Sequence, residues 1–258
     1  MRFSARPSSG LVLVAGLLVL WEVSARLDWM HTPNWPPLTH VLAALLRDTL
    51  TGEIPLLVGG TLWRMAAGLA AGGVVGVAVG MVFAALPLTA RLFGPTVELI
   101  RPIPIPAVIP PLVLFLGLDN TMKVTVVALT VFFPVLTNTM QGVGAVEADT
   151  LAMGRTFGIG PLRRALHITL PAVLPYILAG FRVSLALALV VTVVAEMIAG
   201  EQGVGHYLVM MQFAGRAPEM YATVVVLAVL GYLLNRAFLM MERRVIHWWF
   251  ALGRQHDE

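Results

Sequence analysis

Histidines and carboxylates are the side chains best suited to acid–base or metal chemistry, and this sequence scatters them. The histidines share no metal-ligand spacing such as H-E-x-x-H; they are His31, His40, His167, His206, His247 and His256. The acidic residues near apolar stretches form two loose pairs, Glu147 with Asp149 and Glu196 with Glu201. A catalytic pair would have to converge in space. The spacing therefore gives little support to a membrane-embedded enzyme, and no metal site is predicted.

The sequence also lacks the residues for nucleotide and thiol chemistry. A phosphate-binding P-loop needs a glycine-rich turn followed by Lys and then Ser or Thr. The only lysine, Lys123, lies in DNTMKVTV, which has no such glycines, and the chain contains no cysteine. If ATP drives this protein, the ATPase must be another polypeptide. This chain itself is expected to bind no cofactor.

Charges within or beside apolar stretches are costly and are therefore candidate functional groups. Here they are Arg64, Arg101, Arg182 and Glu196. Arg182, in ILAGFRVSLAL, could extend its head group toward the cytoplasm, and Glu196 could meet water or pair with an arginine. An interfacial or helix-pairing role is the simpler explanation for each residue. A place in a transport pathway is the alternative.

The most ordered cluster of charge is GRTFGIGPLRRALHITLPAVLP, residues 154–175. Apolar spacing predicts a short helix that runs up to Phe157, and Gly158 suits the C′ position, where a left-handed backbone is wanted. Pro161 suits the first position of a second helix, which Leu170–Pro171 is expected to end. A positive inner loop would explain the arginines but not this Gly and Pro pattern. A surface that docks a soluble partner explains both.

The elements that position these residues follow from composition. The chain has 258 residues, of which 58% are hydrophobic and 12% charged, with a mean hydropathy of +0.85. So apolar a chain, with several long apolar runs, predicts a polytopic membrane protein, and hydrocarbon favours helices because it cannot solvate open backbone groups. We expect an all-α fold with about six spanning helices, at residues 10–27, 62–86, 106–118, 121–140, 176–199 and 220–241.

Proline and glycine mark three of these regions. In RPIPIPAVIPPLVLFLGL, prolines interrupt the amide ladder, so regular helix is not expected there. The second span places glycines every four residues, which predicts close packing against another helix; they are Gly68, Gly72, Gly76 and Gly80. Between the first two spans, WPPLTHVLAALLRDTLTGEI predicts an amphipathic helix along the outer surface, with Val41, Leu42, Leu45, Leu46 and Thr49 at helical spacing and Gly52 as its stop.

Arginine placement sets the orientation, because cytoplasmic loops carry an excess of Lys and Arg. Most arginines fall inside if both termini are cytoplasmic, and residues 145–171 then face the cytoplasm. The first apolar stretch, preceded by Arg2 and Arg6, also fits a cleavable signal peptide. At the C-terminus, Trp248 and Trp249 lie beside arginines and predict an interfacial anchor, with an ordinary helix end as the alternative.

Several stretches together resemble the permease subunits of binding-protein-dependent ABC importers, specifically the nitrate, sulfonate and taurine branch. They cover roughly residues 35–240 and are TLWRMAAG, RPIPIPAVIPPLVLFLGL, FFPVLTNTMQGV, AGFRVSLALALVVTVVAEMIAGEQGVGHYL and the cytoplasmic stretch around Gly158. In the family, that stretch has the pattern E-A-A, three residues, Gly, and later I-x-L-P. Gly158 and Ile168–Pro171 match it. The resemblance favours a retained first helix over a signal peptide.

The acidic position of the family pattern is not matched. Its E-A-A triplet falls on Ala152, Met153 and Gly154, whereas the similar Glu147-Ala148-Asp149 lies too early in the chain. The resemblance still implies that this region couples to an ATPase. The residues it assigns to coupling are Ala152, Met153, Gly154, Arg155, Thr156, Phe157, Gly158, Ile168, Leu170 and Pro171.

The resemblance implies an ABC importer type I permease-like fold, with residues 1–258 forming one transmembrane permease domain and 145–171 its cytoplasmic coupling loop. Its partners would be a second permease copy in a homodimer, two cytoplasmic ATPases that bind ATP and Mg, an external substrate-binding protein and membrane lipid, but no nucleic acid. The protein would reside in a bacterial inner membrane and import a small solute, by default an oxyanion or sulfonate. The fifth and third spans would line the path. A self-sufficient secondary transporter or channel is the alternative.

Overall fold

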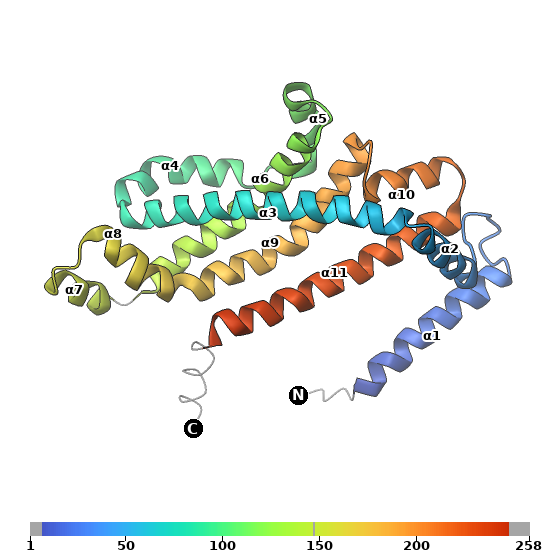
Figure 1. The fold of residues 1–258 in the computed structure, drawn as a ribbon, viewed down its shortest axis with the longest axis horizontal. Coiled ribbons are helices and arrows are strands. Elements are labelled where there is room, and N and C mark those ends of the chain that lie inside the picture. The colour runs from blue at the N-terminus through green and yellow to red at the C-terminus, as the bar shows by residue number, and fades with distance from the viewer. Residues whose placement is uncertain (1–6, 147, 248–258) are drawn as a thin grey trace.

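A computed structural model describes residues 7–146 and 148–247, and within these ranges all regular structure is helical (Figure 1). The long helices are α1 (Pro7–Arg26), α3 (Glu53–Ala85), α6 (Asn120–Gly144), α9 (Leu170–Ala199) and α11 (Ala217–Val245). The shorter helices are α2 (Leu38–Leu50), α4 (Pro87–Ile100), α5 (Ile105–Leu116), α7 (Ala148–Thr156), α8 (Pro161–Arg164), the π-helix η1 (Ala165–Thr169) and α10 (Val204–Phe213). The predicted all-α fold is confirmed.

Within the described residues, four helices are long and apolar enough to cross a membrane, namely α3, α6, α11 and the continuous helix Leu162–Ala199. The pair α4–α5 also passes this test, although the two helices are bent by 97°. Because α3 and α6 run parallel, the chain must return between them, and α4–α5 is the stretch that does so. The bent pair is therefore one broken span. The predicted span 106–118 is wrong as a separate crossing, since the 12 residues of α5 cover only about 18 Å.

The glycines of α3 form the closest helix contact. An added Cβ at Gly72 would lie 2.2 Å from the carbonyl oxygen of Ala128, and one at Gly68 would lie 2.5 Å from Cβ of Val127. The predicted close packing is confirmed, because the absence of side chains lets α3 lie directly on the backbone of α6. On its other side α6 packs antiparallel against α9, where Gly180 faces Val135. The larger of two clusters of buried apolar side chains in the described residues lies mainly among these three helices and also includes Ile109 of α5 and Phe238 of α11.

Two expectations about proline were wrong. Residues 105–116 are helical, since Pro106 occupies the first turn, where no amide partner is needed, and only Pro110 and Pro111 lie further inside. Leu170–Pro171 does not end a helix either: the chain stays helical from Leu162 to Ala199. The π turn just before Pro171, in which Leu170 N–H donates to the Ala165 carbonyl, is wider than an α turn and makes room for the proline ring.

The amphipathic helix at residues 38–50 exists, and Gly52 adopts the left-handed backbone (φ +83°) that a helix stop requires. Its buried face differs from the predicted one. Val41 and Asp48 are buried, whereas Leu46 is exposed. The reason is a polar contact to α10, because the Tyr207 hydroxyl donates to Asp48 Oδ2 over 3.0 Å. Burial, followed by this hydrogen bond, raises the pKa of Tyr207.

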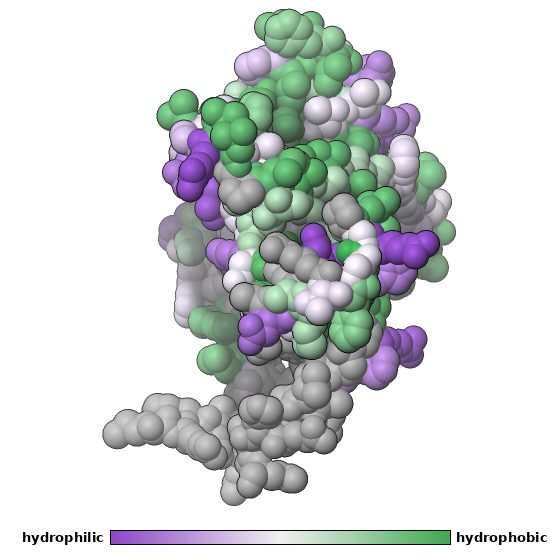
Figure 2. All heavy atoms as spheres, turned by 90° about the vertical axis from the view of Figure 1, so that its left-hand side faces the viewer, coloured by the Kyte–Doolittle hydropathy of each residue, from purple (hydrophilic) through white to green (hydrophobic). Residues whose placement is uncertain are grey.

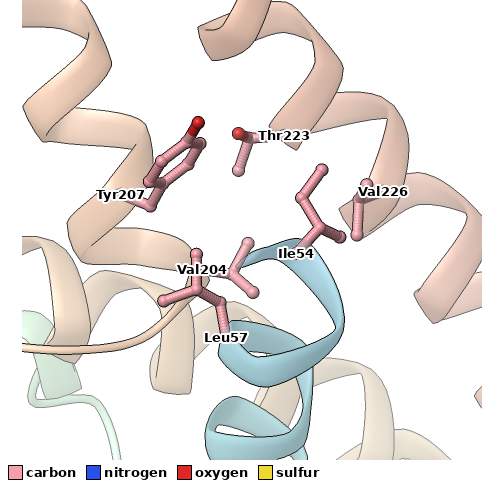
Figure 3. A pocket seen from close by; sticks show the side chains of 6 residues that line it. All are labelled: Ile54, Leu57, Val204, Tyr207, Thr223 and Val226. Atoms are coloured by element: carbon pink, nitrogen blue, oxygen red, sulfur yellow. The ribbon is translucent and has the colours of Figure 1, made fainter. Parts of the chain in front are cut away.

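The start of α3 is clamped between α10 and α11. A cavity of about 10 Å³ remains there, lined by Ile54, Leu57, Val204, Tyr207, Thr223 and Val226 (Figure 3). Such a space holds about one water at most. The start of α3 is therefore closely packed, and α10 is held to the bundle by contacts with both long helices.

Candidate functional site

Two regions at opposite ends of the bundle hold most of the candidate residues. The first is the turn after α7, where Gly158 has φ +67° and Ile159 N–H donates to the Gly154 carbonyl over 3.1 Å. This six-to-one hydrogen bond with a left-handed glycine is a Schellman motif, so the predicted C′ glycine is confirmed. We call residues 148–171 the tip segment, because they form the end of the molecule at the left of Figure 1.

The tip segment exposes large apolar side chains. Phe157 is 77% exposed and Met153 56%, and Leu162 and Leu166 beyond the turn are exposed as well. Figure 2 looks onto this end of the molecule, where hydrophobic and hydrophilic side chains are intermixed. A water-exposed apolar cluster of this kind is typical of a surface that a partner covers.

The remaining residues assigned to coupling lie around that cluster. Gly154 is buried, and an added Cβ there would lie 3.0 Å from Ile168 Cδ1, so α7 packs onto the π turn. Ala152, Thr156 and Pro171 are exposed and Leu170 is half-buried. The side chain of Arg155 lies outside what the structure describes, as do Glu147, Arg2, Arg6, Trp248 and Trp249. A role in ATPase coupling for residues 152–158, Ile168, Leu170 and Pro171 stays a prediction.

The second region is a buried ion pair near the start of α3. Arg64 Nη1 lies 2.8 Å from Glu196 Oε1, and the two residues are 5% and 0% exposed. Thr61, one turn before Arg64 on the same face of α3, donates its hydroxyl to Glu196 Oε2 over 2.9 Å. Gly205 N–H donates to the same oxygen over 3.1 Å. The helix-pairing interpretation of Arg64 and Glu196 is confirmed, and a pathway role stays a prediction.

The chain turn after α9 is shaped around this carboxylate. Gly203 has φ +123°, and an added Cβ there would lie 2.2 Å from Glu196 Cδ. Any other residue would therefore be strained in its backbone and would also collide with the carboxylate. Val204 N–H donates to the hydroxyl of Thr61 over 3.1 Å, which ties the turn to α3 as well.

Buried positive charge exceeds buried negative charge at this site. Arg64 Nε donates to Asn120 Oδ1 over 2.6 Å, so one guanidinium joins α3, α6 and α9. Lys123, one turn further along α6, is 3% exposed, and within the described residues no hydrogen bond or ion pair engages its ammonium. The charges that act on it include Arg64, Glu196 and the exposed carboxylates of Asp119 and Glu201. The buried charges at this site are thus two cations and one carboxylate, and the carboxylate pairs with Arg64.

A hollow of about 570 Å³ opens beside the guanidinium. Its walls include Leu56, Gly60, Trp63, Arg64 and Gln202. An added Cβ at Gly60 would lie 3.2 Å from Arg64 Nη1, so the glycine leaves that side of the guanidinium uncovered. Nη2 of Arg64 makes no hydrogen bond within the described part of the chain.

The other two candidate charges lie elsewhere. Arg182 pairs with Glu242 of α11, so it links α9 to α11. Arg101 is exposed at the bend between α4 and α5, and the described residues offer it no side-chain partner. The structure therefore does not bring the four candidate charges together. In the described ranges, no three His, Asp or Glu side chains converge as a metal site would require.

The sequence interpretation missed the residues that complete these pairs, chiefly Thr61, Asn120, Gly205 and Glu242. Two signals for them were present. Thr61 precedes Arg64 by three residues, which places both on one helix face. The glycines at 200, 203 and 205 follow Glu196 closely and mark a turn with a close backbone approach.

Comparisons with known proteins agree with this architecture. The family model described as "Binding-protein-dependent transport system inner membrane component" matches residues 72–247. SsuC of Bacillus subtilis, whose name assigns it to aliphatic sulfonates transport, is 28% identical over 93% of this chain and 87% of its own length. The taurine transport system permease protein TauC of Escherichia coli is 29% identical over 91% of this chain and 87% of its own. An inward-facing structure of the MetNI methionine ABC transporter has a TM-score of 0.67 at 19% identity, over 77% of this chain and 98% of that chain.

Proposed function

This chain belongs to the binding-protein-dependent transport system inner membrane components, and we propose that it passes a small sulfonate from an external binding protein to the cytoplasm by alternating access. It is a multi-pass permease subunit of an ABC importer, and its relatives are permeases rather than ATPases. The sulfonate cargo is supported by SsuC and TauC, because taurine is itself a sulfonate. The family implies a substrate-binding protein and an ATPase as partners.

Uptake into proteoliposomes tests the cargo. The purified permease is reconstituted with its ATPase, and labelled taurine is added outside together with the binding protein. ATP-dependent accumulation is expected only when all components are present. Accumulation by the permease alone would instead support the alternative of a self-sufficient secondary transporter or channel.

The observation that carries the proposal is the tip segment, with its capped helix end and exposed apolar side chains. We assign this surface to a cytoplasmic ATPase, which binds ATP and Mg on its own chain. A left-handed glycine fixes the direction of the chain after α7, so movement of the docked partner reaches the bundle through the continuous helix that starts at Leu162.

Replacement of one exposed apolar side chain tests this contact. Phe157→Ser should abolish co-purification of the ATPase, because Phe157 is 77% exposed at the tip. Leu50→Ser is the matched control: Leu50 is 78% exposed but belongs to α2, at the other end of the bundle. Equal ATPase recovery with both variants would contradict the assignment.

A second copy of the chain is proposed to cover the broken span α4–α5. Leu114 and Phe115 of α5 are 85% and 84% exposed, among the most exposed large apolar side chains of the described residues. Native mass spectrometry of the complex should give two permease chains and two ATPases. A single permease chain per complex would contradict the homodimer.

The tip segment and both termini are proposed to face the cytoplasm. The chain has no cysteine, so single cysteines report sidedness directly. Phe157→Cys at the tip and Phe213→Cys at the end of α10 are both highly exposed and lie at opposite ends of the bundle (Figure 1). In intact cells, a membrane-impermeant maleimide should label only the second. Labelling of Phe157→Cys alone would contradict the proposed topology and would place the tip segment outside the cell.

A further inference from the structure

The hollow beside Arg64 has the charge of an anion site. Arg64 lines the hollow, and it belongs to a group of buried charges that also includes Lys123 and Glu196, which are not among the lining residues. That carboxylate is already saturated by Arg64, the Thr61 hydroxyl and the Gly205 amide. Buried cations without a full set of partners favour a bound anion, because desolvated charge is costly unless it is paired. The nearby carboxylates of Asp119 and Glu201 are exposed to solvent, which weakens their effect on a buried anion.

The guanidinium also has free hydrogen-bond donors on the side of the hollow. Nε is used by Asn120 and one hydrogen of Nη1 by Glu196, which leaves Nη2 and the second Nη1 hydrogen. Gly60 keeps this side open, since even a methyl group there would lie 3.2 Å from Nη1. Two parallel N–H donors of one guanidinium match two oxygens of a sulfonate, a carboxylate or a phosphate.

Apart from Gln202, the rest of the wall consists of apolar residues and glycines. Leu56 is 79% and Trp63 58% exposed, and both line the hollow. At about 570 Å³, the space is larger than a bare inorganic oxyanion needs. We propose that it binds an organic anion with a short aliphatic tail, of the alkanesulfonate type, with the head group on Arg64 and the tail on Trp63 and Leu56. This inference rests on the proposed sulfonate cargo and makes the hollow a site for that cargo on the permease itself.

Calorimetric titration of the full-length chain in phosphatidylcholine nanodiscs tests the head-group contact. Pentanesulfonate should bind saturably, and 1-pentanol, which lacks the charge, should not. Gly60→Ala should weaken pentanesulfonate binding by about tenfold or more, because the methyl group covers the donors that a charge-assisted hydrogen bond needs. Gly94→Ala is the matched control, a helical glycine on α4 whose added Cβ would meet nothing within 4 Å. Equal binding by both variants would overturn the site.

The tail contact has its own readout. In the wild type, affinity should rise about fourfold per methylene from ethanesulfonate to pentanesulfonate, as expected for burial of aliphatic carbon. Trp63→Ala should flatten this series while ethanesulfonate still binds. Trp63 is exposed, so the variant is expected to fold, and its thermal unfolding is recorded alongside. An unchanged series in Trp63→Ala would overturn the placement of the tail.

Two further comparisons separate the sources of the anion and the two proposals. If phosphatidylglycerol nanodiscs abolish pentanesulfonate binding competitively, the site belongs to a lipid head group and the cargo assignment is overturned. If no sulfonate binds the permease while ATP-driven uptake of taurine proceeds, the site is wrong and the proposed function stands. If pentanesulfonate binds as described but no sulfonate is taken up, the proposed function fails independently of the site.

Discussion

Neutralising one member of the Arg64–Glu196 pair should destabilise the protein strongly. Glu196→Gln removes the carboxylate charge and leaves Arg64, which is 5% exposed, with Asn120 as its remaining partner. Loss of one member of a buried ion pair costs about 3–5 kcal/mol, because the other charge stays buried without compensation. Arg64→Gln should cost a similar amount. The carboxylate would keep the Thr61 and Gly205 donors but lose its countercharge.

The double variant separates the pair energy from everything else. With both charges removed, neither residue leaves an uncompensated charge behind, so the loss should be smaller than the sum of the two single losses. We expect a coupling energy of about 2 kcal/mol, within the range found for groups in direct contact.

The free energy of unfolding can be measured for each purified variant in mixed micelles by titration with sodium dodecyl sulfate, followed by circular dichroism. Arg26→Gln serves as the control, since its partner Glu22 belongs to an exposed pair whose loss should cost far less than loss of a buried pair. Single losses that add within about 0.5 kcal/mol in the double variant would refute the coupling. A loss from Glu196→Gln no larger than from Arg26→Gln would refute the burial argument.

Three other changes follow from the same geometry. Gly72→Ala should cost about 1–3 kcal/mol of unfolding free energy by overpacking, because its Cβ would lie 2.2 Å from the Ala128 carbonyl oxygen. Gly94→Ala should be neutral or slightly stabilising. Equal losses in the two variants would contradict this. Gly158→Pro should uncouple ATP hydrolysis from uptake in proteoliposomes, since proline cannot adopt φ +67°, and normal transport would contradict it. Burial raises the pKa of Tyr207, so the free energy of unfolding should fall as the pH rises above 10.0, the ordinary tyrosine value. Tyr207→Phe should make this fall less steep. A variant whose unfolding free energy falls as steeply at high pH as that of the wild type would contradict the reasoning.

Features that depend on local backbone geometry could be predicted from the sequence. The four-residue glycine period of α3 identified its contact face because a helix repeats every 3.6 residues. Gly158 was recognisable as a C′ residue because few residues other than glycine accept a left-handed backbone there. Gly52 at the end of α2 followed for the same reason. In each case a single residue type meets a requirement set within one or two turns of chain.

Features that depend on distant contacts could not be predicted. Arg64 and Glu196 are 132 residues apart, and spacing gave no reason to prefer this partnership over one with Glu201. Helix continuity through Pro171 depends on a π turn. The helix α2 buries Asp48 rather than Leu46 because the hydroxyl of Tyr207 in α10 donates a hydrogen bond to that carboxylate. Proline and hydrophobic periodicity describe what a lone helix prefers, and tertiary contacts override these preferences here.

The glycine seam between α3 and α6 also bears on how the molecule can move. A contact made by main-chain atoms has no rotamers through which to adjust, so α3 cannot slide along α6 without steric collision. The guanidinium of Arg64 fastens the same two helices to α9. These three helices therefore travel as one rigid body. By contrast, only 6% of the residues in the most apolar stretch of α11 are buried, and α4 meets α5 at a sharp bend. Any hinge that opens the permease to one side or the other has to lie in those outer elements.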